Sequence, residues 1–304
     1  MRKYRKLHFT RFSFIICLFF IVCTPASYSN NTKIPGYDIS QPDTILILPD
    51  ILHEISGLTN IDQNSFACIQ DENGILFIYD IVDNKITKQY NFHIDGDYEG
   101  ITRVENSIYI LRSDGTLFEI SDYRATDFKL RSFSTGIPAS NNEGLCYDAG
   151  NHRLLIACKS KPGKGPEYKD KRVVYGFDLK SKQISDEPVF NFNVNEIKAF
   201  AQEKKLNVIA RTKKKGETTA PLIKYLMSAI AIHPFTQKLY VLSAVDHMLF
   251  IFDSGGTLEH IELLNAEMFN KAEGITFTAN GDLLITNEGQ NKKPTLLRFN
   301  FLNQ

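Results

Sequence analysis

A repeat of about 44 residues constrains the fold of this chain more than any other feature. The pattern Glu-Gly-(Ile/Leu)-(Thr/Cys) occurs at residues 99–102, 143–146 and 273–276, and weaker copies that begin with Ser occur at residues 56–59 and 228–231. The first residues of successive copies are 43, 44, 85 and 45 residues apart. Periods of about 40 to 50 residues are typical of folds that use one supersecondary unit per repeat.

Each copy of the repeat is followed by two further short apolar runs. The second run is strand-like, as in residues 107–111, and the third ends in an aromatic residue and usually an acid, as in residues 250–253. Turn dipeptides such as Asn73-Gly74 and Asp114-Gly115 lie between these two runs. Short strands, tight turns and this period predict an all-β fold, a β-propeller of four-stranded blades.

The spacing of the copies leaves the number of blades open between five and six. Five repeats are explicit, and the 85-residue gap between residues 143 and 228 has room for a sixth. Within that gap, residues 195–205 place apolar side chains at helical spacing. We therefore expect five blades plus a partly helical insertion at about residues 194–227, with six blades as the alternative. The strand-like residues 44–48 have no partner of their own, and we expect this N-terminal strand to close the last blade, because closure removes an open edge.

The N-terminus predicts export. Residues 1–12 contain five basic residues and no acid, and residues 12–22 form an apolar run of the length found in signal peptides. We therefore divide the 304-residue chain into a signal peptide or N-terminal membrane anchor (1–26), a linker (27–42) and a single propeller domain (43–304). Lipidation at Cys23 stays open as a third possibility. The exported protein would be either soluble or tethered to the plasma membrane.

Charge and cysteine content bear on partners and on redox state. The whole chain holds 35 basic and 35 acidic residues, and removal of the five basic residues of the leader leaves a net charge of about −5. An acidic domain argues against nucleic-acid binding, because phosphate contacts need basic surface. Three cysteines follow the leader, Cys68, Cys146 and Cys158, which is too few for a disulfide framework. We expect buried thiols.

The repeat also predicts where polar side chains converge. In a propeller the first strand of each blade lines the central channel, and the start of that strand lies on the same face as the loop between the second and third strands. These positions give a candidate ligand funnel formed by strand starts and by loops. Its residues are Ser56, Glu99, Glu143, Ser228 and Glu273 from the strand starts, and Gln70, Arg112, Lys159 and Asn287 from the loops.

Several carboxylates around one axis repel each other unless a positive charge lies among them. A Ca²⁺ ion is one candidate, because calcium prefers carboxylate and carbonyl oxygens. The candidate metal ligands are Glu99, Glu143, Glu273, Asp71 and Glu288. Two alternatives stay open: Arg112 and Lys159 neutralise the glutamates without a metal, or the repeated polar residues simply hydrogen-bond to neighbouring blades.

Two basic segments are expected over the same face, at residues 159–172 and 211–215. They would either attract an anionic ligand, wall polymer or membrane surface, or form an ordinary solvated loop. The common catalytic motifs for nucleophilic serine, phosphate loops and zinc proteases are absent from the sequence. Among the histidines, His53 and His247 lie nearest the expected rim.

The order and spacing of these motifs resemble the SdiA-regulated (YjiK-like) family over about residues 43–300. The resemblance is carried by residues 54–59, 97–101, 142–145, 171–179, 228–234, 272–277 and 287–289. It implies a β-propeller of the bacterial envelope, in a family without an agreed biochemical activity, within a group of propellers that includes calcium-dependent phosphoesterases and phytase-like proteins. This chain has Ser56 and Ser228 where its stronger repeats have Glu, so any ring of carboxylates is incomplete.

Two hypotheses for function follow. The first is a binding or scaffolding propeller in the periplasm, for an envelope ligand or protein, in which the funnel binds the ligand with or without Ca²⁺. The second is a calcium-dependent hydrolase of phosphate or carboxylic esters, in which Glu99, Glu143, Glu273 and Asp71 hold the metal and a bound water attacks. A membrane-tethered structural protein is a third class, and it depends on the leader alone.

Overall fold

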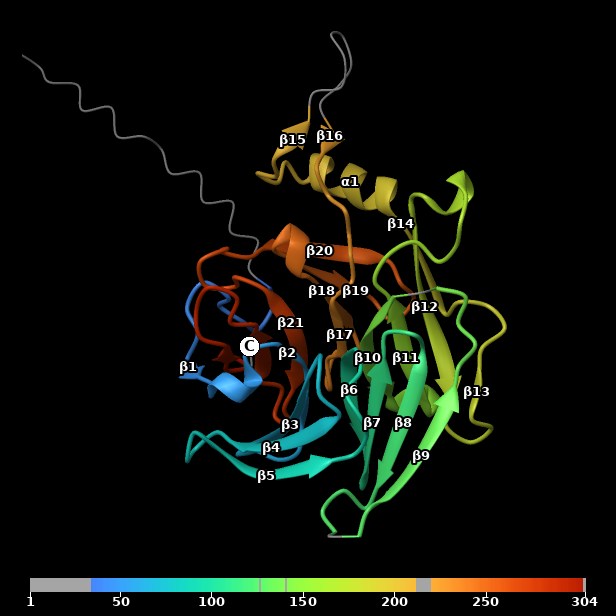
Figure 1. Cartoon of the computed structure of the whole chain (residues 1–304). Helices are drawn as coiled ribbons and strands as arrows, with labels where there is room; N and C mark the ends of the chain where they lie inside the picture. The colour runs from blue at the N-terminus through green and yellow to red at the C-terminus, as the bar shows by residue number, and fades with distance from the viewer. Residues whose placement is uncertain (1–33, 126, 140, 212–219, 303–304) are drawn as a thin grey trace, which may run out of the picture. The chain divides into compact units, whose positions relative to one another are not determined.

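The computed structural model describes residues 34–302, apart from residues 126, 140 and 212–219. Within these residues it forms five antiparallel sheets arranged as blades (Figure 1), four with four strands and one with five. The strands of a blade follow the sequence from the axis outward, except that the N-terminal strand is the outermost strand of the last blade. The first blade comprises β2 (Ile55–Asn60), β3 (Ser65–Gln70), β4 (Ile75–Asp80) and β5 (Lys85–Asn91). The second comprises β6 (Tyr98–Val104), β7 (Ser107–Arg112), β8 (Thr116–Ser121) and β9 (Lys129–Ser134).

The third blade comprises β10 (Asn142–Asp148), β11 (Arg153–Cys158), β12 (Lys171–Asp178) and β13 (Gln183–Ile184), with β14 (Phe190–Asn193) as a further partner of β12. The fourth comprises β17 (Ala229–Ile232), β18 (Leu239–Ser243), β19 (Met248–Phe252) and β20 (Leu258–Leu263). The fifth comprises β21 (Ala272–Phe277), β22 (Leu283–Asn287), β23 (Thr295–Phe299) and β1 (Thr44–Ile47).

The five inner strands contact one another in a closed ring, in the order β2, β6, β10, β17 and β21 and back to β2. Figure 1 shows them around a common centre. The prediction of a five-bladed propeller is therefore confirmed, and the six-bladed alternative is wrong. The described residues between β10 and β17 complete the third blade and add an insertion, so they form no extra blade.

Burial falls from the middle of each blade outward. The second strands are buried on both faces, as in β22, because each blade packs against two neighbouring blades. The outermost strands β5 and β9 are mostly exposed and carry the polar side chains. Cys68, Cys146 and Cys158 are buried free thiols, as expected.

The last blade is closed by the N-terminal strand. β1 pairs antiparallel with β23, in a register that runs from Thr44 opposite Arg298 to Ile47 opposite Thr295. This pairing confirms the expected closure and gives β23 a partner on its outer edge. Short 3₁₀ turns at Asp50–Leu52, Ala149–Asn151, Pro166–Tyr168 and Ala244–Asp246 complete the ordered loops.

Residues 27–42 were expected to be a linker, but the described part of this segment is packed into the propeller. Ile34, Tyr37 and Ile39 are buried in the core shared with the fourth and fifth blades. The Tyr37 hydroxyl donates a hydrogen bond to the Gly281 carbonyl. The propeller therefore includes residues before 43, because these apolar side chains leave water. Residues 1–33, with the predicted leader, lie outside the described residues.

The insertion begins with a helix, as predicted. α1 (Val194–Glu203) starts after Asn193, whose side chain accepts a hydrogen bond from the Asn195 amide (2.9 Å), and it buries Val194, Ile197 and Ala201. A short hairpin of β15 (Ala210–Arg211) and β16 (Ala220–Pro221) follows. No helix among the described residues is long and apolar enough to cross a membrane.

The glycine of the repeat is required by the narrow ring. A Cβ atom on Gly100 would lie 2.6 Å from the Glu143 carbonyl oxygen and 2.7 Å from Leu145 Cβ, both on the next inner strand. A Cβ atom on Gly274 would lie 2.6 Å from a Leu58 side-chain carbon. Real Cβ atoms do not make contacts this short. Adjacent inner strands can therefore approach this closely only because these positions are glycine.

We therefore expect Gly100→Ala to destabilise the propeller by about 1–3 kcal/mol, the usual cost of forcing an extra carbon into a packed core. Urea unfolding followed by circular dichroism measures the change. Gly150→Ala is the matched control, because its nearest neighbour would be Asp148 Oδ1 at 3.7 Å. Equal stability of the Gly100→Ala protein and the wild type would contradict this account of the repeat.

Candidate functional site

The polar residue of the repeat lies in a β-bulge. The register between the first and second strands shifts at Ser56, Glu99, Glu143 and Glu273, each between its two flanking residues. A bulge leaves one residue unpaired and redirects its side chain. All four residues line one small cavity of about 10 Å³ on the channel axis, which has room for about one water molecule.

The two serines of the repeat hold neighbouring blades together. Ser56 Oγ donates to the Tyr98 carbonyl at 2.7 Å, and Ser228 Oγ donates to the Ala272 carbonyl at 3.0 Å. Each bond joins one inner strand to the start of the next. Hydrogen bonding to the neighbouring blade therefore explains the two serines of the repeat, Ser56 and Ser228. It does not explain the glutamates at the equivalent positions.

The glutamates are compensated by two lysines. Lys159 Nζ lies 2.5 Å from Glu143 Oε1. Lys271 Nζ lies 2.5 Å from Glu288 Oε1 and 3.7 Å from Glu273 Oε1. We call these two lysines with Glu99, Glu143, Glu273 and Glu288 the axial cluster. Lys159 thus neutralises a glutamate, as the sequence analysis suggested. The same analysis did not identify Lys271.

Arg112 does not join the axial cluster. Its guanidinium forms a bidentate pair with Asp114, at 3.1 and 2.7 Å, within the turn between β7 and β8. Gln70 and Asn287 also hold local structure: Gln70 Oε1 accepts from the Asn73 amide at 3.2 Å, and Asn287 Nδ2 donates to the Met268 carbonyl at 3.1 Å. These three candidates shape the rim.

Exposure separates the charges of the axial cluster into two layers. The side chains of Lys159 and Lys271 are 29% and 34% exposed, whereas those of Glu143, Glu273 and Glu288 are 2%, 8% and 9% exposed. Each lysine therefore keeps part of its side chain in solvent, whereas the carboxylates of the cluster are buried. Glu143 Oε2 is buried and has no hydrogen-bond partner.

Burial perturbs the titration of the whole cluster. Burial, and then the neighbouring Glu143 carboxylate, raises the pKa of Glu99 to about 9, so Glu99 keeps its proton at neutral pH. Burial also raises the pKa of Glu143 and of Glu273, although Lys159 opposes both shifts. Burial alone would lower the pKa of Lys159, but the Glu143 carboxylate raises it above its usual value. Lys159 stays charged.

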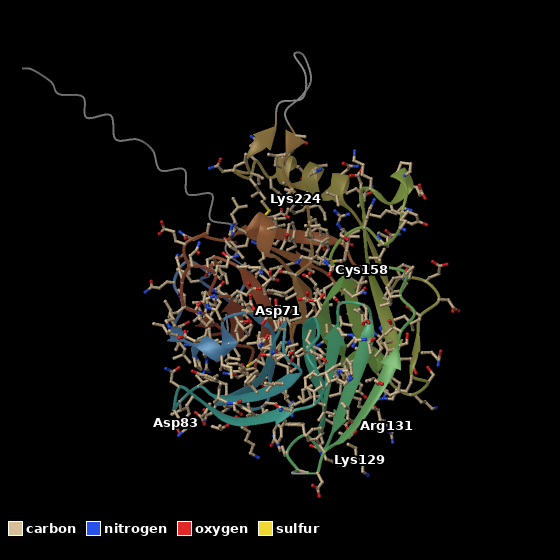
Figure 2. All side chains as sticks on the ribbon, in the orientation of Figure 1. Asp71, Asp83, Lys129, Arg131, Cys158 and Lys224 are labelled. Carbon is tan, nitrogen blue, oxygen red and sulfur yellow. The ribbon has the colours of Figure 1, made fainter. Side chains whose placement is uncertain are left out.

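Asp71 lies beside the cluster. Figure 2 shows it over the centre of the ring, whereas Asp83, Lys129 and Arg131 lie at the edge. Its Oδ1 atom is buried without a partner, and burial, followed by the charge of Glu54, raises its pKa to about 6. Among the described residues, no group of three or more histidine, cysteine, aspartate or glutamate side chains has an arrangement that could hold a metal ion.

A pocket of about 470 Å³ opens above the axial cluster, and we call it the mouth pocket. It is lined by Lys159, Leu226, Ser228, Ala244, Val245, His247, Asn270, Lys271, Glu273 and Gln290. The His247 Nδ1 atom donates to the Phe269 carbonyl at 3.0 Å, which leaves Nε2 as an acceptor. His53 is instead bound to the Gln290 carbonyl at 3.1 Å.

A ring of aliphatic residues forms the floor of the channel. One residue from each blade lines both the axial cavity and a separate pocket of about 310 Å³ toward the other ends of the inner strands: Leu58, Ile101, Leu145, Ile230 and Ile275. This ring keeps water from reaching the carboxylates from the far side. It is one physical cause of their burial.

The expected basic segments differ in their roles. Lys161, Lys164 and Lys169 on the loop before β12, and Lys171 at the start of β12, are exposed, as expected for a basic lip. Arg172 is instead buried, with its guanidinium bonded to the Tyr225 and Lys224 carbonyls at 3.1 and 2.9 Å. The second segment, residues 211–215, lies outside the described residues except for the backbone of Arg211.

Comparisons with known proteins agree with this architecture. A family model described as SdiA-regulated matches residues 35–292. The crystal structure of Myxococcus xanthus glutaminyl cyclase is similar, with a TM-score of 0.58 and 13% identity over 86% of this chain and 97% of that chain. A streptogramin B lyase structure matches with a TM-score of 0.47 and 11% identity, over 82% and 94% of the two chains. At 13% identity the glutaminyl cyclase match shows the fold alone. A search of curated protein sequences finds no match.

The raised pKa of Glu99 predicts a pH-dependent stability. Between the usual carboxyl pKa and about 9, the unfolded chain has lost this proton while the folded protein retains it, so stability falls as pH rises through that window. We expect Glu99→Gln to raise the melting temperature by a few degrees at pH 8.5, and to have little effect at pH 5. Differential scanning calorimetry in EDTA measures both.

The control for this prediction is Glu187→Gln, which changes an exposed carboxyl. It should shift the melting temperature equally little at both pH values. A Glu99→Gln protein that is destabilised at pH 8.5 would show that the ionised carboxylate is stabilising, which is opposite to our account.

Proposed function

The chain belongs to the SdiA-regulated family, and we propose that its propeller is a binding module that holds a small negatively charged ligand in the mouth pocket. One observation carries the proposal: Lys159 and Lys271 both line the pocket with partly exposed side chains, while their carboxylate partners Glu143 and Glu288 are buried. We also propose, as the sequence suggests, that this module is exported to the bacterial envelope.

The ammonium groups have unused hydrogen-bonding capacity. A lysine ammonium carries three donors. Among the described residues, Lys159 and Lys271 each contact one carboxylate oxygen at 2.5 Å, and Lys271 also lies 3.7 Å from Glu273 Oε1. The remaining donors can bind a carboxylate or phosphate oxygen that enters the pocket. Charge-assisted bonds of this kind are among the stronger hydrogen bonds in proteins.

The buried glutamates prepare the site for this role. Because they fix both ammonium groups in place before a ligand arrives, less side-chain entropy is lost on binding. Because Glu99 is protonated at neutral pH, the carboxylates beneath the pocket do not all carry charge. The lining of the pocket contains two lysines and one glutamate, Glu273, although the domain as a whole is acidic.

Calcium remains a competing hypothesis for the same residues, supported by the convergence of Glu99, Glu143 and Glu273 on one cavity. In this alternative the metal activates a water for hydrolysis of a phosphate or carboxylic ester. The ion would have to displace Lys159 and Lys271 from their glutamate partners, because each lysine is paired with a carboxylate of the axial cluster.

The anion hypothesis predicts that the two lysines control affinity. We expect Lys159→Met and Lys271→Met each to weaken binding of acetate and inorganic phosphate by about 10- to 100-fold, the range for losing a hydrogen bond to a charged group. Isothermal titration calorimetry measures the affinities. Lys161→Met, an exposed lysine two residues away, serves as the matched control and should leave them unchanged.

Removal of one lysine leaves a buried carboxylate without its partner, which destabilises proteins strongly. The double variant Lys159→Met/Glu143→Gln avoids this problem, and it should fold while still binding anions weakly. Wild-type affinity in the folded double variant, or no anion binding by the wild type, would refute the proposal.

Calcium titration separates the two hypotheses. If the pocket is an anion site, millimolar Ca²⁺ should leave the melting temperature unchanged, because a ligand stabilises only the state that binds it. A rise in melting temperature that disappears in Glu143→Gln, together with calcium-dependent turnover of p-nitrophenyl acetate or phosphate, would favour the hydrolase instead.

A further inference from the structure

The mouth pocket has an apolar wall as well as a charged floor. From this arrangement, and resting on the proposed function, we infer that the pocket selects organic anions that carry a small apolar body over inorganic anions. The wall is built by residues 222–227, the last part of the insertion, which we call the strap. Leu226 of the strap lines the pocket together with Ala244 and Val245.

The strap alternates buried and outward-facing residues. Ile223, Tyr225 and Met227 are buried in the core beside the third and fourth blades. Leu222 is 49% exposed, Lys224 is exposed, and Leu226 is half-buried at the pocket. An extended chain places alternate side chains on opposite sides. The three anchors therefore fix which side chain the strap presents to the ligand.

Two charged residues from different blades clamp the strap backbone. Arg172, at the start of β12, binds the carbonyls of Lys224 and Tyr225. Asp246, in the turn after β18, accepts from the amides of the same two residues at 2.9 and 2.7 Å. All four polar backbone groups of this dipeptide are thus satisfied by side chains, so the position of the strap depends on both blades.

Tyr225 anchors the clamped segment in a strained conformation. Its φ angle is 50°, in the left-handed region that non-glycine residues rarely adopt. Its ring is fully buried against Phe192, Phe250 and Phe252. Strain of this kind persists only where the surroundings fix it, and it is often found at ligand sites. The strap is therefore a fixed wall and not a loose loop.

The strap also connects the wall to the charged floor. The Met227 amide donates to the Lys159 carbonyl at 3.3 Å, so Leu226 lies next in sequence to a residue bonded to the lysine. A ligand whose anionic group binds Lys159 and Lys271 would place its remaining atoms against Leu226 and Val245. The volume of about 470 Å³ greatly exceeds what acetate or phosphate fills.

Affinities for a series of anions test this inference. We expect hexanoate to bind about 10- to 100-fold more tightly than acetate, because its additional methylene groups pack against the apolar wall and are thereby removed from water. Inorganic phosphate should bind no better than acetate. Isothermal titration calorimetry of the whole protein with these three probes measures the selectivity, expressed as the ratio of the acetate and hexanoate dissociation constants.

Leu226→Ala should lower this ratio several-fold, because it removes apolar contact from hexanoate and weakens acetate binding much less. The matched control is Leu222→Ala, an equally conservative truncation on the same strap whose exposed side chain does not line the pocket. It should leave the ratio unchanged.

Arg172 is a positioning residue in this account. Arg172→Met should reduce selectivity without changing acetate affinity, and Arg172→Lys should restore it in part, because a lysine can still bind one strap carbonyl. Loss of stability alone would not produce this pattern in the folded protein.

The experiments distinguish failure of the selectivity inference from failure of the proposed anion site. If acetate and hexanoate bind with equal affinity, or Leu226→Ala leaves their ratio unchanged, the strap has no role in selectivity and the inference is wrong, while the anion site stands. If none of the three anions binds the wild type, the proposed function fails, and the inference fails with it.

Discussion

The close approach of five inner strands around one axis is the constraint on which the rest of the molecule depends. A ring this narrow leaves no space for a side chain at the strand crossing, and Gly100 and Gly274 occupy such positions. The bulge immediately before each of these glycines directs a glutamate toward the axis. The same geometry that closes the ring thus brings like charges together, and Lys159 and Lys271 are the compensation that this crowding requires.

Charge compensation and ligand binding are linked at this position. A buried carboxylate is costly unless it is paired or protonated, and the axial cluster uses both solutions: lysines pair with Glu143 and Glu288, and Glu99 keeps its proton. Because the pairing cations come from the rim, they remain partly in water. The stability requirement of the ring therefore places two lysines in the lining of the mouth pocket, beside residues of the fourth and fifth blades.

The period of the sequence was sufficient to predict the blades, the closure by β1 and the helix of the insertion, because these features repeat or have local periodicity. The convergence of Glu99, Glu143 and Glu273 on one cavity was also predictable from their equivalent places in the repeat. Lys271 and the inward turn of Arg172 were not predictable, because Glu288 lies 17 residues from Lys271, the strap carbonyls lie 52 and 53 residues from Arg172, and no pattern marks these pairs. The one sequence signal that could have identified Lys271 is its position two residues before Glu273, which makes it a basic residue next to the repeat. The burial of Ile34 and Tyr37 was missed because so short a segment has no period.

The pairing of β1 with β23 also governs the order in which the propeller can be completed. Thr44 finds its partner only at Arg298, so the strand that emerges first from the ribosome finishes the blade that emerges last. Such long-range pairing slows folding, because a large loop must close before its contacts form. Until then β23 has an unpaired outer edge, which is a template for misassociation with other chains. The chain consequently has a late, vulnerable folding step at its closing blade, when a chaperone or holdase would be of greatest use.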